Sequence, residues 1–348
     1  MKIKSGIPID VTKCNCLSTF ILCMVFTASC LMLDSCKKKS TEEPTNQAYS
    51  NMKDDSTKAI DVSIPRIMLS KTKSTTITIF LSVTDQNGNP FRDFNRYNFT
   101  VKQVCDSTTD TTLVASITFT RADIEGYDMA TSMVMDYSGS MAGKATKDMA
   151  NAAKQFVRLK KDQDYCEIIK FDDVIQVCQA FTSDTAKLMT AIDGKYGGGA
   201  TAFYDATLKG ITDASGFTTS QYGILPAVVA FTDGQDNRSV SDLLSCISAA
   251  NSDQMPVYTI GFRPSVDSAS LKLLAGQTGG RYYFTPDSEQ LSEFYSKISR
   301  QLKNEYMLSW PFDNSTCHKV WVIVTATYTC ANGTFTAKTE KYLFPVKK

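Results

Sequence analysis

Apolar and polar residues alternate along two stretches of the chain, residues 62 to about 120 and residues 305 to 348. In the first stretch, Ile77 to Thr84 alternate before DQNGNP, where Asn87-Gly88 suits a hairpin turn. In the second, VWVIVTATY precedes an Asn332-Gly333 turn and the return strand TAKTEKYLF. Alternation with period 2 predicts β-strands. Because a hairpin or two alone is marginal in water, we expect both stretches to pair into one small β-sandwich. Two separate small β units are the alternative.

Between these stretches, from about residue 128 to 304, short apolar runs alternate with helical patterns. The runs MATSMVM, ILPAVVAF and PVYTIGF have the length of strands buried on both faces, and YCEIIKF and VIQVCQAF predict a strand pair. KATKDMANAAKQFVRL and DSEQLSEFYSKISRQL space apolar residues at helical intervals. The pattern predicts an α/β domain with a doubly wound, mostly parallel sheet, inserted in or flanked by the β-sandwich.

The N-terminus has the pattern of a targeting segment. Lys2, Lys4 and Lys13 precede the apolar run CLSTFILCMVFTASCLML, as in a secretory signal peptide. The sequence LDSC, which ends at Cys36, resembles the cleavage box of bacterial lipoproteins, in which that cysteine carries lipid such as palmitate. Cys30 in TASC is the second candidate. The alternative is an uncleaved membrane helix, since the run is just long enough to span a bilayer.

These patterns divide the chain into five predicted parts. Residues 1–36 are a lipoprotein-type signal segment, and the polar residues 37–61 are a flexible tether. Residues 62–126 are the first part of the β-sandwich, 127–304 the α/β domain, and 305–348 the second part of the sandwich. We expect the protein to be lipid-anchored in a bacterial cell envelope, at the periplasmic or surface face of the outer membrane.

Charge and histidine content narrow the function. The 348 residues are 43% hydrophobic and carry a net charge of +1, so nothing indicates binding to nucleic acid. The single histidine, His318, removes most His-dependent catalytic schemes. The serine-containing stretch YSGSM lacks the G-x-S-x-G arrangement of a nucleophile elbow. We therefore expect no enzyme.

Cysteines leave the redox state open. Six of the eleven lie beyond the signal segment, namely Cys105, Cys166, Cys178, Cys246, Cys317 and Cys330. No pair has the C-x-x-C spacing of a zinc knuckle. In an oxidising compartment a disulfide between Cys317 and Cys330 is one expectation, and one between Cys166 and Cys178 is another. Free apolar thiols are the alternative for each pair.

Oxygen-bearing side chains follow two of the apolar runs. Asp136, Ser138 and Ser140 come directly after MATSMVM, and Asp233 follows ILPAVVAF. The glycine-rich loop YGGGATAFYDA adds Thr201 at the start of a helix. Ligands of open α/β sheets bind outside the carboxyl ends of the strands, so these five residues are expected to converge. Two carboxylates and three hydroxyls suit a hard cation, Mg²⁺ first and Mn²⁺ or Ca²⁺ as alternatives.

Neighbouring polar residues have simpler roles. Taken alone, Asp136, Ser138 and Ser140 would also suit a capped helix start. Together with Thr201 and Asp233, they favour a metal site. Asp205 is expected to cap or buttress its own helix, with support of the metal ligands as the alternative. Asp236 and Asn237 are expected to cap the next helix or hold the loop.

Three segments carry a family resemblance. MDYSGSM, GGGATAFYDA and FTDGQDN resemble, in order and spacing, the metal-ion-dependent adhesion site of von Willebrand factor type A domains. The resemblance covers about residues 127–304. It implies a mostly parallel sheet with helices on both faces, a divalent cation at the top of the sheet, and protein–ligand binding.

We therefore expect a cation-dependent binding or adhesion protein that engages an acidic group of a protein or other macromolecule. The metal's open coordination position would accept the partner's carboxylate. Two rivals are a structural or assembly factor of an envelope complex, in which the metal mainly stabilises, and a cytoplasmic-facing partner of an ATPase, known among relatives of this domain.

Overall fold

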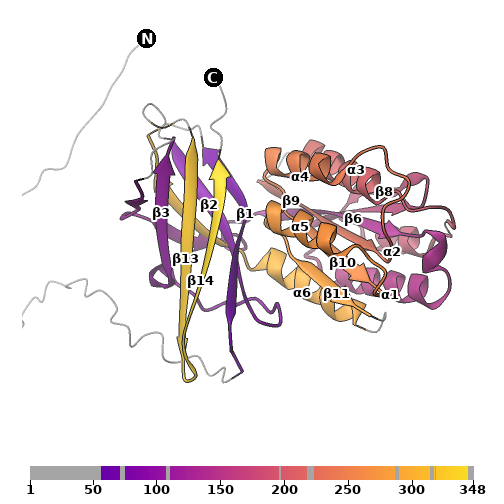
Figure 1. Ribbon diagram of the computed structural model, residues 1–348, viewed down its shortest axis with the longest axis horizontal. Coiled ribbons are helices and arrows are strands. Elements are labelled where there is room, and N and C mark those ends of the chain that lie inside the picture. The colour runs from indigo at the N-terminus through magenta and orange to yellow at the C-terminus, as the bar shows by residue number, and fades with distance from the viewer. Residues whose placement is uncertain are drawn as a thin grey trace, which may run out of the picture. The chain divides into compact units, whose positions relative to one another are not determined.

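A computed structural model describes residues 56–70, 75–106, 110–195, 197–217, 223–286, 290–313, 317 and 319–343 (Figure 1). The predicted signal segment, Cys30, Cys36, most of the tether and His318 lie outside the described residues. No helix within the described ranges is long and apolar enough to cross a membrane.

Residues 128–303 fold around a mostly parallel sheet. Its strand order is β11-β10-β9-β6-β7-β8, and only β8 runs antiparallel to its neighbour. The strands are β6 (Asp128–Asp136), β7 (Tyr165–Phe171), β8 (Ile175–Thr182), β9 (Ile224–Thr232), β10 (Val257–Phe262) and β11 (Tyr282–Thr285). The helices are α1 (Lys144–Leu159), α2 (Thr185–Asp193), α3 (Phe203–Gly216), α4 (Leu243–Ser252), α5 (Ser268–Thr278) and α6 (Leu291–Lys303).

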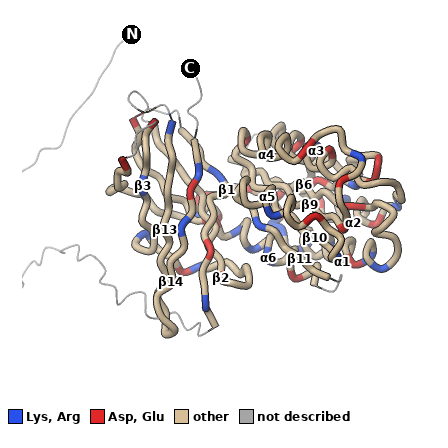
Figure 2. The backbone as a smooth tube through the Cα atoms, viewed as in Figure 1, with Lys and Arg blue, Asp and Glu red and all other residues tan. Residues whose placement is uncertain are grey.

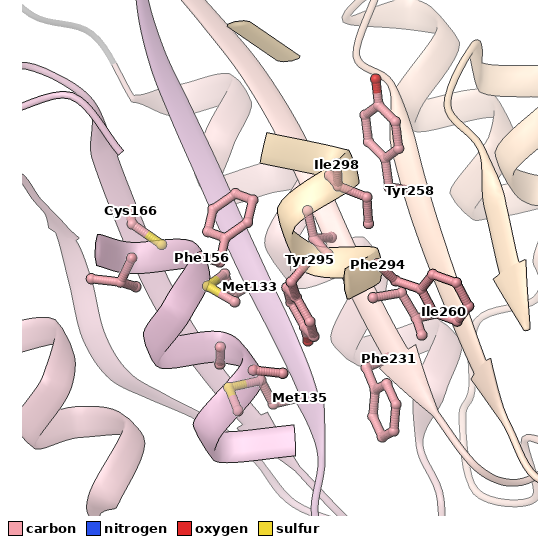
Figure 3. Packing of buried hydrophobic residues seen from close by; sticks show 14 of the residues in the cluster. Met133, Met135, Phe156, Cys166, Phe231, Tyr258, Ile260, Phe294, Tyr295 and Ile298 are labelled. Carbon is pink, nitrogen blue, oxygen red and sulfur yellow. The ribbon is translucent and has the colours of Figure 1, made fainter. Parts of the chain in front are cut away.

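Helices cover both faces of this sheet because its strands are apolar on both sides. Met133 and Met135 of β6 face α1 and α6, where they pack near Phe156 and Tyr295 (Figure 3). Val134, between them, packs with residues of α3, α4 and α5 on the other face. Strands β9 and β10 carry no charged residue (Figure 2). The predicted double winding is confirmed.

Two antiparallel sheets combine strands from both ends of the described chain. One has the order β1-β2-β12-β5 and the other β14-β13-β3-β4. The strands are β1 (Ile60–Ser70), β2 (Thr76–Asp85), β3 (Phe99–Cys105), β4 (Thr112–Leu113), β5 (Thr118–Arg121), β12 (Tyr306–Pro311), β13 (Val320–Cys330) and β14 (Gly333–Leu343), and a 3₁₀ turn, η2 (Arg96–Asn98), precedes β3. Their apolar faces share one core, which includes Phe94, Tyr306 and Tyr328. The predicted fold class is thus confirmed. The exact boundaries at residues 126 and 304 stay predictions, and they fall between β5 and β6 and between α6 and β12.

The disulfide differs from both expected pairs. Cys105 is bonded to Cys317, with 5.3 Å between their Cα atoms, and Cys330 is a free thiol. The expected Cys317–Cys330 bridge is wrong because residues 320–330 form one continuous strand, which carries the two cysteines to opposite ends. β13 pairs with β3 so that Val320 lies opposite Cys105, which brings Cys317 beside it.

The Cys166–Cys178 pair is also not bonded, and both residues are free thiols. Cys166 lies opposite Thr182 in the β7–β8 pair, so the register separates it from Cys178. Burial raises the pKa of the Cys166 thiol, in keeping with the buried-thiol alternative.

A buried ion pair joins β1 to the segment between α6 and β12. Arg66 Nε lies 3.1 Å from Glu305 Oε2 and its Nη2 lies 3.0 Å from Oε1, while Nη1 donates to the Pro226 carbonyl at 2.8 Å. The exposed fractions of the two charged side chains are 2% and 0%. Removal of either side chain would thus leave the other charge buried without a partner, which is strongly destabilising.

Glu305→Ala is expected to lower the free energy of unfolding by about 3–5 kcal/mol, because it leaves the Arg66 guanidinium buried and uncompensated. Urea denaturation would measure the loss. The double variant Arg66→Met, Glu305→Leu should lose much less. Asp123→Ala, which breaks the partly exposed pair with Arg121, is the control and should cost about 0.2–1 kcal/mol. Equal losses for E305A and D123A would contradict the role given to the buried pair.

Candidate metal centre

The two predicted carboxylates lie at one edge of the central sheet. β6 and β9 are parallel neighbours in which Met135 lies opposite Phe231, so Asp136 and Asp233 follow at the same end of the sheet. Their exposed fractions are 0% and 1%. We call this end, where β6, β9 and β10 finish, the carboxyl edge.

Asp136 is held by hydrogen bonds from both sides. Its Oδ1 accepts from the Ser138 backbone N–H at 2.8 Å, and its Oδ2 accepts from the Thr232 hydroxyl at 2.6 Å. Thr232 is the last residue of β9 and was not predicted as part of the site. Its hydroxyl binds the carboxylate of the neighbouring strand, so it orients Asp136 within the edge.

The two serines connect Asp136 to Asp233. Ser138 is buried, whereas Ser140 lies exposed in the short 3₁₀ turn η3 (Gly139–Met141). Their hydroxyl oxygens are 3.2 Å apart, and the Ser140 hydroxyl donates to Asp233 Oδ1 at 2.7 Å. Four of the five predicted residues are therefore linked by a chain of hydrogen bonds, from Asp136 through Ser138 and Ser140 to Asp233.

The glycine-rich loop places Thr201 next to this group. The Gly139 N–H donates to the Gly199 carbonyl at 3.0 Å, which fastens the loop to the serine turn. Thr201 is buried, and its hydroxyl oxygen lies 3.6 Å from the point that a Cβ on Gly234 would occupy. The third predicted segment thus lies next to the residue that follows Asp233.

Asn237 and Asp236 hold the loop after β9, as expected. Asn237 Oδ1 accepts from the Thr201 N–H at 2.9 Å, and the Asn237 N–H donates to the Thr201 carbonyl at 3.1 Å. Asp236 Oδ2 accepts from the Tyr204 N–H at 2.8 Å. These bonds tie the start of α3 to the loop that carries Asp233.

Asp205, in the first turn of α3, supports the loop after β9 and not its own helix, which the sequence predicts it to cap or buttress. Its two carboxylate oxygens accept from the N–H groups of Val240 and Ser241, at 2.9 and 2.8 Å. These hydrogen bonds lower the pKa of Asp205 against the effect of its burial. Asp205 therefore buttresses the loop at the carboxyl edge.

Arg263 is a site neighbour that sequence reasoning missed. Its Nη1 lies 2.9 Å from Asp233 Oδ2 and donates to the Ser140 carbonyl at 2.6 Å. The only signal for it in the sequence is its position directly after the run PVYTIGF, since that strand ends at the same edge as β9.

The residues present fit a hard cation. Within the described ranges, no three Cys, His, Asp or Glu side chains gather as a metal-binding group. Two buried carboxylates and three hydroxyls supply an oxygen donor set, and both carboxylates are shielded from water. Asp136, Ser138, Ser140, Thr201 and Asp233 are the residues that would hold the ion.

Residues 132–297 match the family model of the von Willebrand factor type A domain. Together with the fold, this match shows that these residues form a von Willebrand factor type A domain, as the three sequence segments imply. Domains of this family serve mainly in adhesion and protein–protein interaction.

Several relatives share this part of the chain. The inter-alpha-trypsin inhibitor heavy chain H1 of Sus scrofa is 25% identical over 195 residues, which are 52% of this chain and 22% of that protein. Heavy chain H3 of Mesocricetus auratus is 26% identical over 196 residues, or 51% and 22%. The chain thus spans about a fifth of the length of these curated relatives.

Solved structures include a von Willebrand factor type A protein from Catenulispora acidiphila, with a TM-score of 0.45 and 12% identity. The match covers 82% of this chain and 73% of that one. Another is the conserved hypothetical protein BatB from Bacteroides thetaiotaomicron, with a TM-score of 0.43, 16% identity, and coverage of 51% and 100%.

Burial raises the pKa of Asp136 from 3.8 to about 6, against the hydrogen bonds from Ser138 and Thr232, and the charge of Asp233 raises it further. The folded, metal-free protein therefore holds this proton more tightly than the unfolded chain. Between pH 3.8 and about 6 the unfolded chain releases the proton first, so this group's contribution to stability falls as the pH rises.

The melting temperature of Asp136→Asn minus that of the wild type should therefore increase as the pH rises from 4 to 7. The measurement is thermal melting of protein freed of metal by dialysis. Asp148→Asn, in the exposed Lys144–Asp148 pair of α1, is the control and should show little change in difference. A constant difference for D136N across this range would argue against a raised pKa.

Proposed function

We propose that this protein binds another macromolecule through a divalent cation held by Asp136, Ser138, Ser140, Thr201 and Asp233. The observation that carries the proposal is the meeting of three distant segments at the carboxyl edge. Hydroxyl contacts of 3.2 Å or less run from Ser138 to Asp233, and the glycine-rich loop with Thr201 is bonded to the serine turn through Gly139 and Gly199. The match to a family whose domains serve in adhesion and protein–protein interaction also supports the proposal.

Magnesium is the first candidate, and manganese or calcium are alternatives. Oxygen ligands suit all three, and Mg²⁺ in proteins keeps several waters and few carboxylates. When bound, the ion would supply a coordination position open to a partner's carboxylate. Two carboxylates in the site leave a dication able to attract a further negative group.

The partner is therefore proposed to offer an acidic group, and the loops around the site would select it. Val240 is 98% exposed although Asp205 holds its backbone in place, and Val174, after Asp172-Asp173 in the β7–β8 turn, is 61% exposed. Exposed apolar residues on well-held loops are suited to contact a partner surface. Specificity beyond the acidic group would arise from such contacts.

We propose no catalytic role for the serines. A serine nucleophile requires a base that can take its proton and a place for the developing oxyanion. Ser140 instead donates to Asp233, whose other oxygen is paired with Arg263, and Ser138 contacts Ser140. The arrangement suits coordination of an ion better than acyl transfer.

We further propose that the protein is exported and lipid-anchored through Cys36 in a bacterial envelope. The signal-like N-terminus is the main support, and the Cys105–Cys317 disulfide is in keeping with an oxidising compartment. Metabolic labelling with a palmitate analogue, compared between wild type and Cys36→Ser, would test the anchor. Labelling retained in C36S and lost in Cys30→Ser would move the anchor to Cys30.

The alternative function is that of an assembly factor that docks permanently in an envelope complex, with the ion serving stability. Pull-down from envelope extract separates the two functions. A partner released by chelator supports cation-dependent recognition, and one retained in chelator supports permanent docking.

Adding Mg²⁺ or Mn²⁺ is expected to raise the melting temperature of the folded protein. An ion that binds only the folded state adds about 2.7 kcal/mol at a hundredfold excess over its Kd. Asp136→Ala should abolish the shift, because it removes a carboxylate ligand. Asp148→Asn should keep the shift. A wild-type melt that is the same with metal and with chelator would remove the basis of the proposal.

A further inference from the structure

Arg263 is directed at the site by an uncommon backbone conformation. It follows the last residue of β10 with φ of 69°, a left-handed value that few non-glycine residues adopt. Its N–H donates to the Thr285 carbonyl at 3.0 Å, and its carbonyl accepts from the Val266 N–H at 3.3 Å. The neighbouring strand and the following turn thus hold this conformation in place.

The guanidinium lies against the proposed metal ligands. Nη1 contacts Asp233 Oδ2 at 2.9 Å and the Ser140 carbonyl at 2.6 Å, and Cζ lies 4.8 Å from the centre of the Phe262 ring. The Arg263 side chain is 38% exposed, whereas the side chain of Asp233 is fully buried. The Asp233 carboxylate is therefore inside the site, and the Arg263 side chain is reachable from solvent.

We propose that Arg263 is a built-in cation that holds the site when no metal is bound and competes with the divalent ion for Asp233. This inference rests on the proposed function, since it concerns the same five ligands. Arg263 would act as a positioning residue that sets the metal affinity, and it would keep the edge ordered in the absence of metal.

Burial of Asp233 gives the first physical reason. A buried carboxylate without a compensating partner is costly, and both oxygens of Asp233 are satisfied by Ser140 and Arg263. The metal-free site therefore has its own counter-charge. Without it, the buried carboxylates of Asp136 and Asp233 would be offset only by hydrogen bonds, from the Ser138 N–H and from the hydroxyls of Thr232 and Ser140.

Like-charge repulsion gives the second reason. A dication coordinated by Asp233 would lie within a few ångströms of the guanidinium, where repulsion is strong in a partly buried site. The side chain has a direction in which to withdraw, because part of it already reaches solvent. Exchange of one cation for the other would then leave Asp233 neutralised throughout.

The test compares Arg263→Gln, Arg263→Lys and Arg238→Gln with the wild type. Arg238 lies in the exposed loop after β9, where its backbone N–H contacts Asp236, so R238Q removes a positive charge near the edge without touching Asp233. Affinity for Mg²⁺ and Mn²⁺ is measured by titration calorimetry, and the melting temperature is measured with chelator and with saturating metal.

R263Q is expected to bind Mg²⁺ about tenfold or more tightly than wild type, because the competing charge is gone. Its melting temperature in chelator should fall, so the shift on adding metal should grow. R263K keeps the charge and should stay within about threefold of the wild-type affinity, and R238Q should match the wild type. Good folding of R263K keeps the comparison valid if R263Q is poorly stable.

Two outcomes would overturn the inference. If wild type binds metal and R263Q binds it equally or more weakly, Arg263 does not compete, while the proposed function stands. If neither wild type nor R263Q binds either ion, the inference and the metal site fail together. Binding by R263Q alone would show that the guanidinium outcompetes the ion in wild type, which supports the competition but contradicts the proposed cation-dependent function of the wild-type protein.

Discussion

Parallel pairing of β6 with β9 is the constraint on which the rest of the structure depends. Because Met135 lies opposite Phe231, the carboxylates of Asp136 and Asp233 reach the same edge of the sheet. Helices on both faces keep that sheet dry, so both charges are buried. The serine turn, the glycine-rich loop and the loop after β9 are all arranged around these two groups.

Two buried carboxylates so close together require hydrogen bonds and positive charge. The chain provides hydroxyls from Thr232 and Ser140, and the guanidinium of Arg263 supplies the charge. Burial raises the pKa of Asp136, because a carboxylate charge is costly away from water. The same two buried carboxylates therefore attract a dication and an internal arginine, and either cation can neutralise them.

The β-sandwich depends on the ends of the inserted domain lying close together. β5 precedes the domain and β12 follows it, and the two strands pair with Tyr306 opposite Arg121. Glu305, one residue before β12, forms the buried pair with Arg66 of β1. The chain thus leaves one antiparallel sheet and returns to it, and the central domain folds between two paired strands.

The sequence alone determined the element types and most of the candidate site, because hydrophobic period and residue chemistry are local properties. Asp136, Thr201 and Asp233 were recognisable since each follows a strand or precedes a helix in a distinctive segment. Only the tertiary structure decided that Cys105 is bonded to Cys317, because the register of β3 against β13 sets that pairing. It also brought Arg263 to Asp233, 30 positions away, since strand order in a sheet is settled by packing between distant segments.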